Sequence, residues 1–381
     1  MSELVVDGVP AEAGAEPLAE NRVAIATQRQ LILWRFRKHK LALISAVIVA
    51  LFYFVALFAD TLACTEPFDS QSARGYVPPQ AIHWFDATGH FHPQVFALKG
   101  KRDPRTFKLS YAPDPAEPRD VVLFGRGYPY WLLGVISTNI HLFAVSDGKP
   151  ENSLFLLGTD QLGRDVYSRL VLATRTSLTI GLVGVSLSLA LGVLLGGISG
   201  LYAGAADVVI QRVIEILRSI PTIPLWMGLA AAVPAAWSPQ RVYFAITIII
   251  SLIGWTELAR VVRGRFLALR EEDFITAAEL AGASRMRIIF KHMVPSFLSH
   301  IIAAISLALP AMIISETTLS FLGLGLRPPA ISWGVLLQDA QNLQTLGLAP
   351  WLLVVALPVI VVILAFNFLG DGLRDAADPY G

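Results

Sequence analysis

The sequence predicts an all-α polytopic membrane protein with six transmembrane helices and a mixed, β-containing insert between the first and second helices. Hydrophobic residues make up 54 % of the 381 residues and charged residues only 15 %, whereas soluble domains carry roughly 25 % charged residues. The charges gather in blocks, and the apolar runs between them approach the roughly 20 residues that cross a bilayer. The formal net charge, 30 − 29 = +1, gives no indication of nucleic-acid binding.

The first 40 residues predict a cytoplasmic tail. Its beginning is acidic and rich in small residues, which is typical of disorder; the acidic residues are Glu3, Asp7, Glu12, Glu16 and Glu20. A basic cluster then stands directly before the first apolar run, residues 41–63, and consists of Arg35, Arg37, Lys38 and Lys40. By the positive-inside rule this flank stays in the cytoplasm, so the first helix runs outward.

Residues 64–172 predict a periplasmic insert domain. Proline and aromatic residues are frequent, and short apolar stretches such as 121–124 and 154–157 have the length of strands. Residues 131–145 are apolar enough to suggest a further span. That stretch is shorter than the roughly 20 residues required, contains Asn139 and His141, and would make the number of spans odd. We therefore predict no span there.

The transmembrane core is predicted over residues 173–370. Its five spans are expected at about 177–202, 208–233, 242–262, 297–322 and 351–369. Four glycines recur every four residues in the second span, which favours close packing of another backbone on that face; they are Gly192, Gly196, Gly200 and Gly204. The third span is polar at its start and is interrupted by Pro221 and Pro224, so we expect it to be kinked.

Six spans place both termini in the cytoplasm, with residues 371–381 as the C-terminal tail. The charges of the short loops agree with this topology. The outward loops of the core carry only Arg241 and Arg327, whereas residues 260–295 carry seven basic residues: Arg260, Arg263, Arg265, Arg270, Arg285, Arg287 and Lys291.

The loop between the fourth and fifth spans, residues 263–295, is the one sizeable cytoplasmic loop in this scheme. It predicts two short helices over 273–280 and 284–293, with a turn at Gly282 and with Pro295 leading into the next span. Such a hairpin suits a groove on a partner protein. A solvated basic connector is the alternative that charge alone leaves open.

The motif in this loop resembles a known family. Thr276-Ala277-Ala278-Glu279-Leu280-Ala281-Gly282, with Ala283 after it and Val294-Pro295 twelve residues further on, is similar to the coupling loop of ABC importer permeases. The resemblance implies a type I ABC importer permease fold and a loop that docks on a separate ATPase, which binds the ATP. Thr276 stands where the family usually has Glu, which puts in doubt any polar contact made there.

Three further motifs resemble the C-type permeases of oligopeptide, dipeptide and nickel importers. One, before the second span, contains Gly158, Thr159, Asp160, Gly163, Arg164 and Asp165; the others lie at 316–334 and 367–375. The resemblance implies a bacterial inner-membrane protein that works with a B-type second permease, two cytoplasmic ATPases and a periplasmic solute-binding protein. Peptides are the default cargo, and relatives carry nickel, opines or oligosaccharides.

Several single residues have competing interpretations. Glu316 and Glu257 lie in or near apolar spans, where ionisable groups often mark a pathway or gate, but a helix-end ion pair or an interface position is the simpler explanation of each. The Asp160, Arg164 and Asp165 cluster is expected to cap the second span and to pair internally, with a binding site as the alternative. Cys64 follows the first span, as in a lipoprotein processing site, yet we expect a free thiol.

Other functional classes lack their motifs. No G-x-x-x-x-G-K-S/T phosphate loop is present, so ATP hydrolysis cannot reside in this chain. No nucleophile elbow or zincin motif appears, and His90 and His92 are predicted to lie in a loop without metal. We therefore expect a transport subunit that is not an enzyme and holds no cofactor. An ion-gradient-driven transporter is the alternative, but internal repeats and paired midplane acids are not evident.

Overall fold

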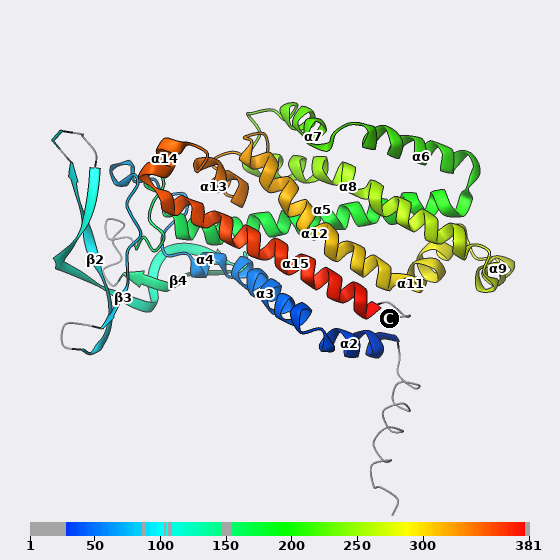
Figure 1. Cartoon of the computed structure of the whole chain (residues 1–381), viewed down its shortest axis with the longest axis horizontal. Helices are drawn as coiled ribbons and strands as arrows, with labels where there is room; N and C mark the ends of the chain where they lie inside the picture. The colour runs from blue at the N-terminus through cyan, green and yellow to red at the C-terminus, as the bar shows by residue number, and fades with distance from the viewer. Residues whose placement is uncertain (1–27, 86–88, 103, 106–108, 146–153, 378–381) are drawn as a thin grey trace, which may run out of the picture.

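A bundle of long helices forms the body of the molecule, with a β-sheet at one end and a short helical hairpin at the other (Figure 1). The computed structural model describes residues 28–85, 89–102, 104–105, 109–145 and 154–377. The acidic segment up to Glu20 and the last four residues of the predicted C-terminal tail lie outside the described residues.

Five helices of the described residues are long and apolar enough to cross a membrane. They are α3 (Lys40–Leu57), α5 (Val166–Tyr202), α8 (Pro239–Leu269), α12 (Leu298–Phe321) and α15 (Ala356–Ala377, preceded by the 3₁₀-helix η4, Pro350–Val355). They confirm a helical polytopic protein. Several are longer than predicted: α5 starts inside the predicted insert, α8 enters the predicted coupling loop, and α15 continues into the predicted tail.

The predicted third span is broken rather than simply kinked. Residues 208–233 fall on α6 (Gly204–Ser219) and α7 (Thr222–Ala231), which meet at an angle of 90°. Ile220 is extended, as expected for a residue before proline, and Pro221 lacks the N–H that would continue the helix. The described residues therefore hold five spans, or six if α6 and α7 together make one.

Close contact between α5 and α8 uses the predicted glycine face. A Cβ atom on Gly196 would lie 2.5 Å from the carbonyl oxygen of Ala259, and one on Gly200 would lie 2.9 Å from that of Arg263. At Gly192 it would meet the Leu258 side chain. Gly204 lies beyond the end of α5 with φ +57°, and a Cβ atom there would meet nothing within 4 Å. Gly196 and Gly200 thus let the two backbones approach closely, and Gly192 leaves room for a side chain.

The insert contains a four-stranded antiparallel sheet in the order β1-β2-β3-β4. Its strands are β1 (His83–Phe85), β2 (Phe91–Arg102), β3 (Leu109–Leu132) and β4 (Ile136–Val145). The 131–145 stretch forms the tip of the β3–β4 hairpin and β4 itself, which confirms that it is not a span. A small core of Val95, Val121, Val145 and Leu154 holds the sheet to the chain that follows it.

Short helices complete the two ends of the bundle. The sheet end holds α4 (Ala59–Leu62), the 3₁₀-turn η1 (Ser72–Arg74), α13 (Trp333–Asp339) and α14 (Leu343–Leu348). The opposite end holds α2 (Gln28–Lys38), α9 (Asp273–Leu280), α10 (Arg285–Arg287), the π-helix η3 (Ile288–Met293) and α11 (Val294–Ser296). The main core lies between α3, α5, α12, α13 and α15, and includes the fully buried Trp333 and Ile313.

The glycine contact gives a testable prediction. Replacing Gly196 with Ala places a methyl group closer to the Ala259 carbonyl oxygen than van der Waals contact allows, so α5 and α8 must separate at a cost of roughly 1–3 kcal/mol. Gly264→Ala on α8 is the matched control, because a Cβ there meets nothing within 4 Å. We expect a lower thermal midpoint for Gly196→Ala in detergent and an unchanged or raised midpoint for Gly264→Ala. Equal midpoints would contradict the contact.

Candidate functional site

The α9–α10 hairpin, which we define as residues 273–293, has a hydrogen-bonded turn between its two helices. The N–H of Ala283 donates to the carbonyl of Ala278 at 3.0 Å, and that of Gly282 donates to the carbonyl of Glu279 at 2.9 Å. This pair of bonds is the Schellman arrangement, which needs a left-handed residue after the helix. Gly282 fills that position with φ +78°. The predicted helices at 273–280 and 284–293 and the turn between them are confirmed.

One face of the hairpin is buried against the spans. Ile275, Ile288, Ile289 and Met293 lie in an apolar cluster with residues from three spans. Those residues are Val193 and Leu201 of α5, Val262 and Phe266 of α8, and Ile301 of α12. The hairpin is therefore anchored by apolar burial to the ends of α5, α8 and α12 together.

The other face of the hairpin is exposed. Thr276, Ala277, Glu279, Leu280 and Ala281 all lie on the surface. Most of these side chains are small or apolar, so this surface offers shape and apolar contact, and Asp273, Arg285 and Arg287 add exposed charges beside it. Pro295 lies in α11, just before α12, as predicted.

An ion pair braces the turn. Glu279 pairs with Arg285 at 3.1 Å across the turn, and the Arg285 guanidinium lies 5.7 Å from the centre of the Tyr202 ring at the end of α5. Glu279 of the predicted motif thus stabilises the hairpin within the chain. The bond is solvent-exposed and adds only a little stability, but it fixes the direction of α10.

A cavity of about 450 Å³ lies among α5, α7, α8 and α12. Its walls are mainly apolar, and Ser188 and Ser315 contribute hydroxyl groups. The indole N–H of Trp226 on α7 has no hydrogen-bond partner in the structure. An apolar cavity with a few polar groups is typical of a site for small solutes.

Glu257 lies on the wall of this cavity and Glu316 does not. The Glu257 carboxylate accepts a short hydrogen bond from Arg218 of α6. A second pair, Arg263 with Asp207, joins the same two helices through two hydrogen bonds of 2.6 Å each. Two ion pairs therefore hold α6 against α8.

Glu316 is fully buried in α12. Its carboxylate accepts hydrogen bonds from Ser320 at 2.8 Å and from Ser177 of α5 at 3.1 Å. Ser177 in turn accepts from the backbone N–H of Trp333 at 3.2 Å. This network joins α5, α12 and α13, so the structure gives Glu316 a positioning role at the sheet end of the bundle.

The motif at 158–165 forms a junction between the insert and α5. Gly158 and Gly163 both have φ +73°, and a Cβ on Gly163 would lie 2.0 Å from the carbonyl oxygen of Gln71. The Thr159 hydroxyl donates to the carbonyl of Arg74 at 2.7 Å and accepts from the N–H of Val77 at 2.8 Å. The motif thus ties residues 71–77 to the start of the core.

Charged partners inside this junction come from distant segments. Asp160 is buried and accepts from Arg164 at 2.7 Å and, by a short bond, from the buried Arg169. Both arginines lie within 4 Å of Asp339 at the end of α13. The predicted internal pairing of Asp160 and Arg164 is confirmed. Neither Arg169 nor Asp339 was predicted, because only the fold brings α13 to α5.

Asp165 caps α5 as the sequence predicts. Its carboxylate accepts the N–H of Ser168 at 2.8 Å. Complete burial raises the pKa of Asp165 to about 6, and the hydrogen bonds from Ser168 offset part of that rise. Burial likewise raises the pKa of Asp339, and the nearby Arg169 opposes the change.

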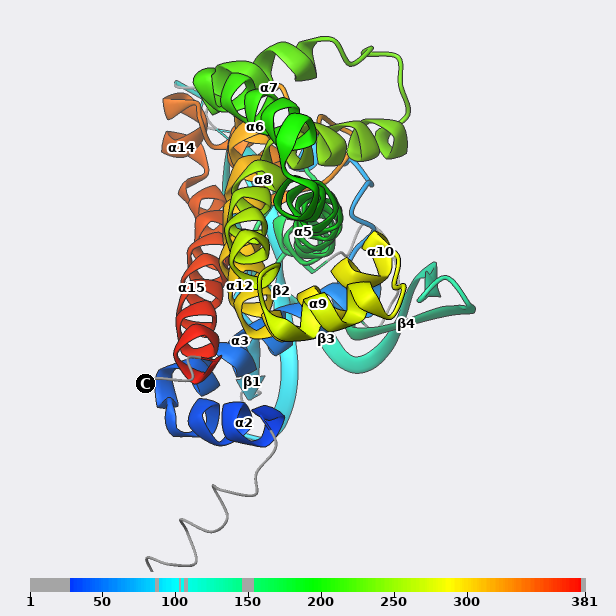
Figure 2. The same ribbon diagram turned by 90° about the vertical axis from the view of Figure 1, so that its right-hand side faces the viewer.

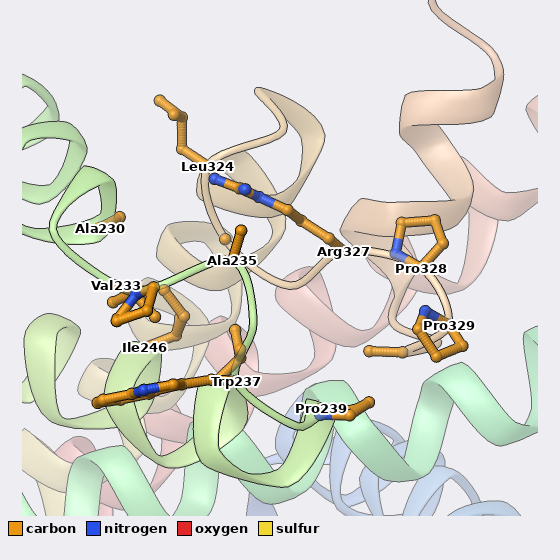
Figure 3. Close-up of a pocket in the computed structure, with 14 residues that line it drawn as sticks. Ala230, Val233, Ala235, Trp237, Pro239, Ile246, Leu324, Arg327, Pro328 and Pro329 are labelled. Carbon is orange, nitrogen blue, oxygen red and sulfur yellow. The ribbon is translucent and has the colours of Figure 1, made fainter.

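A second, smaller cavity of about 120 Å³ lies between the α7–α8 loop and the α12–α13 loop. Trp237 and Pro239 line one side, and Pro328 and Pro329 line the other (Figure 3). Arg327 extends back toward Leu324 (Figure 3), and its Nε donates to the carbonyl of Gly323 at 3.1 Å. The lining is apolar apart from this one cation and carries no acid–base pair.

The described residues contain no cluster of three or more His, Cys, Asp or Glu that would hold a metal ion. His92 lies on β2 rather than in the predicted loop; it is exposed and contacts Asp120 at 2.8 Å. Cys64 is a free thiol, as predicted, and burial raises its pKa.

Two family models match the chain. Residues 192–380 match the family described as binding-protein-dependent transport system inner membrane component. Residues 27–79 match the N-terminal TM domain of oligopeptide transport permease C.

Curated relatives and a solved structure are also similar. An oligopeptide transport system permease protein of Bacillus subtilis is 36 % identical over 61 % of this chain and 73 % of its own. One of Haemophilus influenzae is 40 % identical over 58 % of this chain and 69 % of its own. A dipeptide transport system permease protein of Lactococcus lactis is 38 % identical over 61 % of this chain and 66 % of its own. A chain of the inward-facing MetNI methionine ABC transporter is 19 % identical, with a TM-score of 0.42 over 55 % of this chain and 96 % of that one.

Burial of Asp165 predicts a pH-dependent stability. Because its folded pKa, about 6, exceeds the ordinary value of 3.8, the folded state binds this proton more tightly than the unfolded chain. The cost of the charged carboxylate therefore grows as the pH rises from about 4 to 6 and reaches at most about 3 kcal/mol. Asp165→Asn keeps the cap and lacks the charge. We expect its thermal midpoint, relative to the parent chain, to be higher at pH 8 than at pH 4.5; a pH-independent difference would contradict this.

Proposed function

This chain belongs to the family of binding-protein-dependent transport system inner membrane components, and on that premise we propose that its α9–α10 hairpin is the surface on which a separate ATPase docks. The chain is the permease of an ABC importer, a multi-pass inner-membrane protein. It forms half of a solute pathway, and its relatives are transport permeases rather than enzymes. This membership sets aside the ion-gradient-driven alternative.

One observation carries the docking proposal: the hairpin is buried on one face, and on the other it leaves a group of small or apolar side chains exposed around Leu280. The buried face joins the ends of α5, α8 and α12 in one cluster. A partner that pushes on the exposed face would therefore move three spans together, as packed elements shift in rigid-body transitions. The coupling residues would be Thr276, Ala277, Ala278, Glu279, Gly282, Ala283 and Pro295, with Leu280 at the centre.

The proposed assembly contains this chain, a B-type second permease, two cytoplasmic ATPases and a periplasmic solute-binding protein. The hairpin and both termini would lie in the cytoplasm, and the sheet would lie on the periplasmic side. Basic residues near the hairpin support this orientation, since cytoplasmic loops carry an excess of Lys and Arg. In this arrangement α6 and α7 together make the sixth crossing.

The cargo we propose is a peptide or a similar small solute. The names of the oligopeptide and dipeptide permeases that this chain resembles support it; nickel, opines and oligosaccharides are the alternatives within the family. The cavity among α5, α7, α8 and α12 would be this chain's share of the pathway. Its apolar wall suits varied side chains, and Glu257 with Arg218 would lie at its charged rim.

Leu280→Asp tests the docking surface. The side chain is 85 % exposed, so the fold should tolerate the change, while a carboxylate at the centre of an apolar contact opposes binding. We expect co-purification of the ATPase from detergent to weaken at least about tenfold, or ~1.4 kcal/mol, and uptake to fall with it.

The matched control is Leu343→Asp in α14, at the opposite end of the bundle, where the leucine is also 85 % exposed. It should leave ATPase binding unchanged. Equal binding by the two variants would overturn the proposal that the hairpin is the docking surface.

Ala308→Trp tests the pathway separately. Ala308 lines the large cavity, so an indole there would occupy much of the space while the hairpin stays intact. We expect uptake to be lost, and the ATPase to co-purify normally. Ile302→Trp, on the same helix but outside the cavity and exposed, should retain uptake. Full uptake by Ala308→Trp would show that solute passes elsewhere.

A further inference from the structure

Strand β3 changes character halfway along its length. Its first half is charged and carries Asp114, Glu117, Arg119 and Asp120. From residue 121 to residue 145, through the rest of β3 and all of β4, the only Lys, Arg, Asp or Glu is Arg126. One sheet therefore has a half suited to water and a half suited to an apolar medium.

Part of the apolar half is left exposed by the chain itself. At the hairpin tip, which we define as residues 131–136, four large side chains are exposed: Trp131 at 63 %, Leu133 at 57 %, Val135 at 76 % and Ile136 at 59 %. Phe124 and Ile140, further from the tip, are also exposed. Large apolar side chains gathered in the open in this way mark an interaction site.

The turn at the tip holds an apolar residue where a polar one is the ordinary choice. Leu133 and Gly134 have φ of +53° and +71°, the pattern of a two-residue type I′ turn, which favours Asn-Gly or Asp-Gly. A leucine in the left-handed region is strained, because its Cβ lies too close to the following carbonyl oxygen. The Leu133 side chain packs little against the protein, so contacts within the chain do not offset this strain.

The β3–β4 hairpin is joined to the segment that directly follows the first span. The Tyr130 hydroxyl donates to the carbonyl of Ile140 at 2.7 Å and bonds with the hydroxyl of Thr61 in α4 at 2.8 Å. Helix α4 directly follows span α3, whose Leu51, Phe54 and Leu57 are exposed. The base of the tip is thus tied to the short helix that directly follows a span with exposed apolar side chains.

The figures place the hairpin beside the bundle. The label of β4 lies next to α4 in Figure 1, and in the end-on view of Figure 2 the β3–β4 hairpin projects sideways beyond the helices. Its tip therefore has no helix of this chain over it.

We infer that the hairpin tip inserts into the interfacial region of the membrane leaflet on the sheet side, as a lipid anchor for the insert domain. Interfacial elements of this type reach roughly 5–10 Å into the boundary between headgroups and acyl chains, and Trp131 suits that depth. The turn satisfies its own backbone, because Gly134 donates to the carbonyl of Trp131 at 3.2 Å and Val135 to that of Leu132 at 3.0 Å. Shallow insertion therefore leaves few unpaired groups. The inference rests on the proposed orientation only for naming the leaflet as periplasmic.

Site-directed spin labelling tests the anchor. Cys64 is the only cysteine, so Cys64→Ala gives a background in which Leu133→Cys or Val135→Cys can be labelled singly. The assembled transporter is reconstituted in phosphatidylethanolamine–phosphatidylglycerol nanodiscs, and relaxation by oxygen is compared with relaxation by a water-soluble nickel chelate. We expect the tip labels to be several-fold more accessible to oxygen than to nickel. Ser110→Cys, on the charged half of β3, is the control and should show the reverse.

Two outcomes would overturn the inference. Tip labels as accessible to nickel as the Ser110→Cys control would place the tip in water. Labels shielded from both reagents would place it against a protein partner, the second permease or the solute-binding protein. The Val135→Cys site keeps the test valid if Leu133→Cys disturbs the turn, and none of these substitutions touches the α9–α10 hairpin, so failure of the anchor leaves the docking proposal standing.

Discussion

Direct backbone contact along α5 organises the molecule. Near its middle, the Ser251 hydroxyl of α8 donates to the carbonyl of Gly184 at 3.1 Å. Toward the hairpin end, Gly196 and Gly200 admit α8, and Gly197 leaves room for Ile289 of the hairpin. At the other end, Asp165 caps the helix. The cavity, the hairpin and the junction with the insert are therefore all positioned by one helix, whose small residues let its neighbours approach within contact of the main chain.

Charge is handled differently at the two ends of this helix. At the sheet end, Asp160 and Arg169 are buried, and the cost of removing them from water is offset only because several hydrogen bonds satisfy the carboxylate. Near the hairpin, the pairs that join α6 to α8 are partly exposed. Breaking one of those pairs exposes its charges to water at little cost. The buried ion pairs thus hold the junction with the insert in one arrangement, whereas the ion pairs that hold α6 can break and re-form in water.

The sequence alone predicted most of what local chemistry controls. The two hairpin helices, the turn at Gly282 and the cap at Asp165 follow from residues within a few positions of each other. The break at Ile220–Pro221 was expected only as a kink, because proline sets where a helix ends but not the angle at which the chain resumes. Asp339 was missed since its contact with Arg169 spans 170 positions of sequence, and Glu316 was weighed as a pathway residue because a sequence cannot distinguish a buried carboxylate held by serines from one that faces a cavity.

The coupling role that we propose for the α9–α10 hairpin makes two opposed demands, and one short segment can meet both. It must be rigid enough to transmit a push, so its turn is closed by two backbone hydrogen bonds and its inner face by a core shared with three spans. It must also leave a surface uncommitted, so the side chains that face outward are small or, like Leu280, almost wholly exposed. Periodicity explains the combination: in an eight-residue helix, burying Ile275 leaves Ala277 and Leu280 on the opposite side. The same separation of faces makes the element testable, because a change on the outer face alters binding without entering the core that holds the spans together.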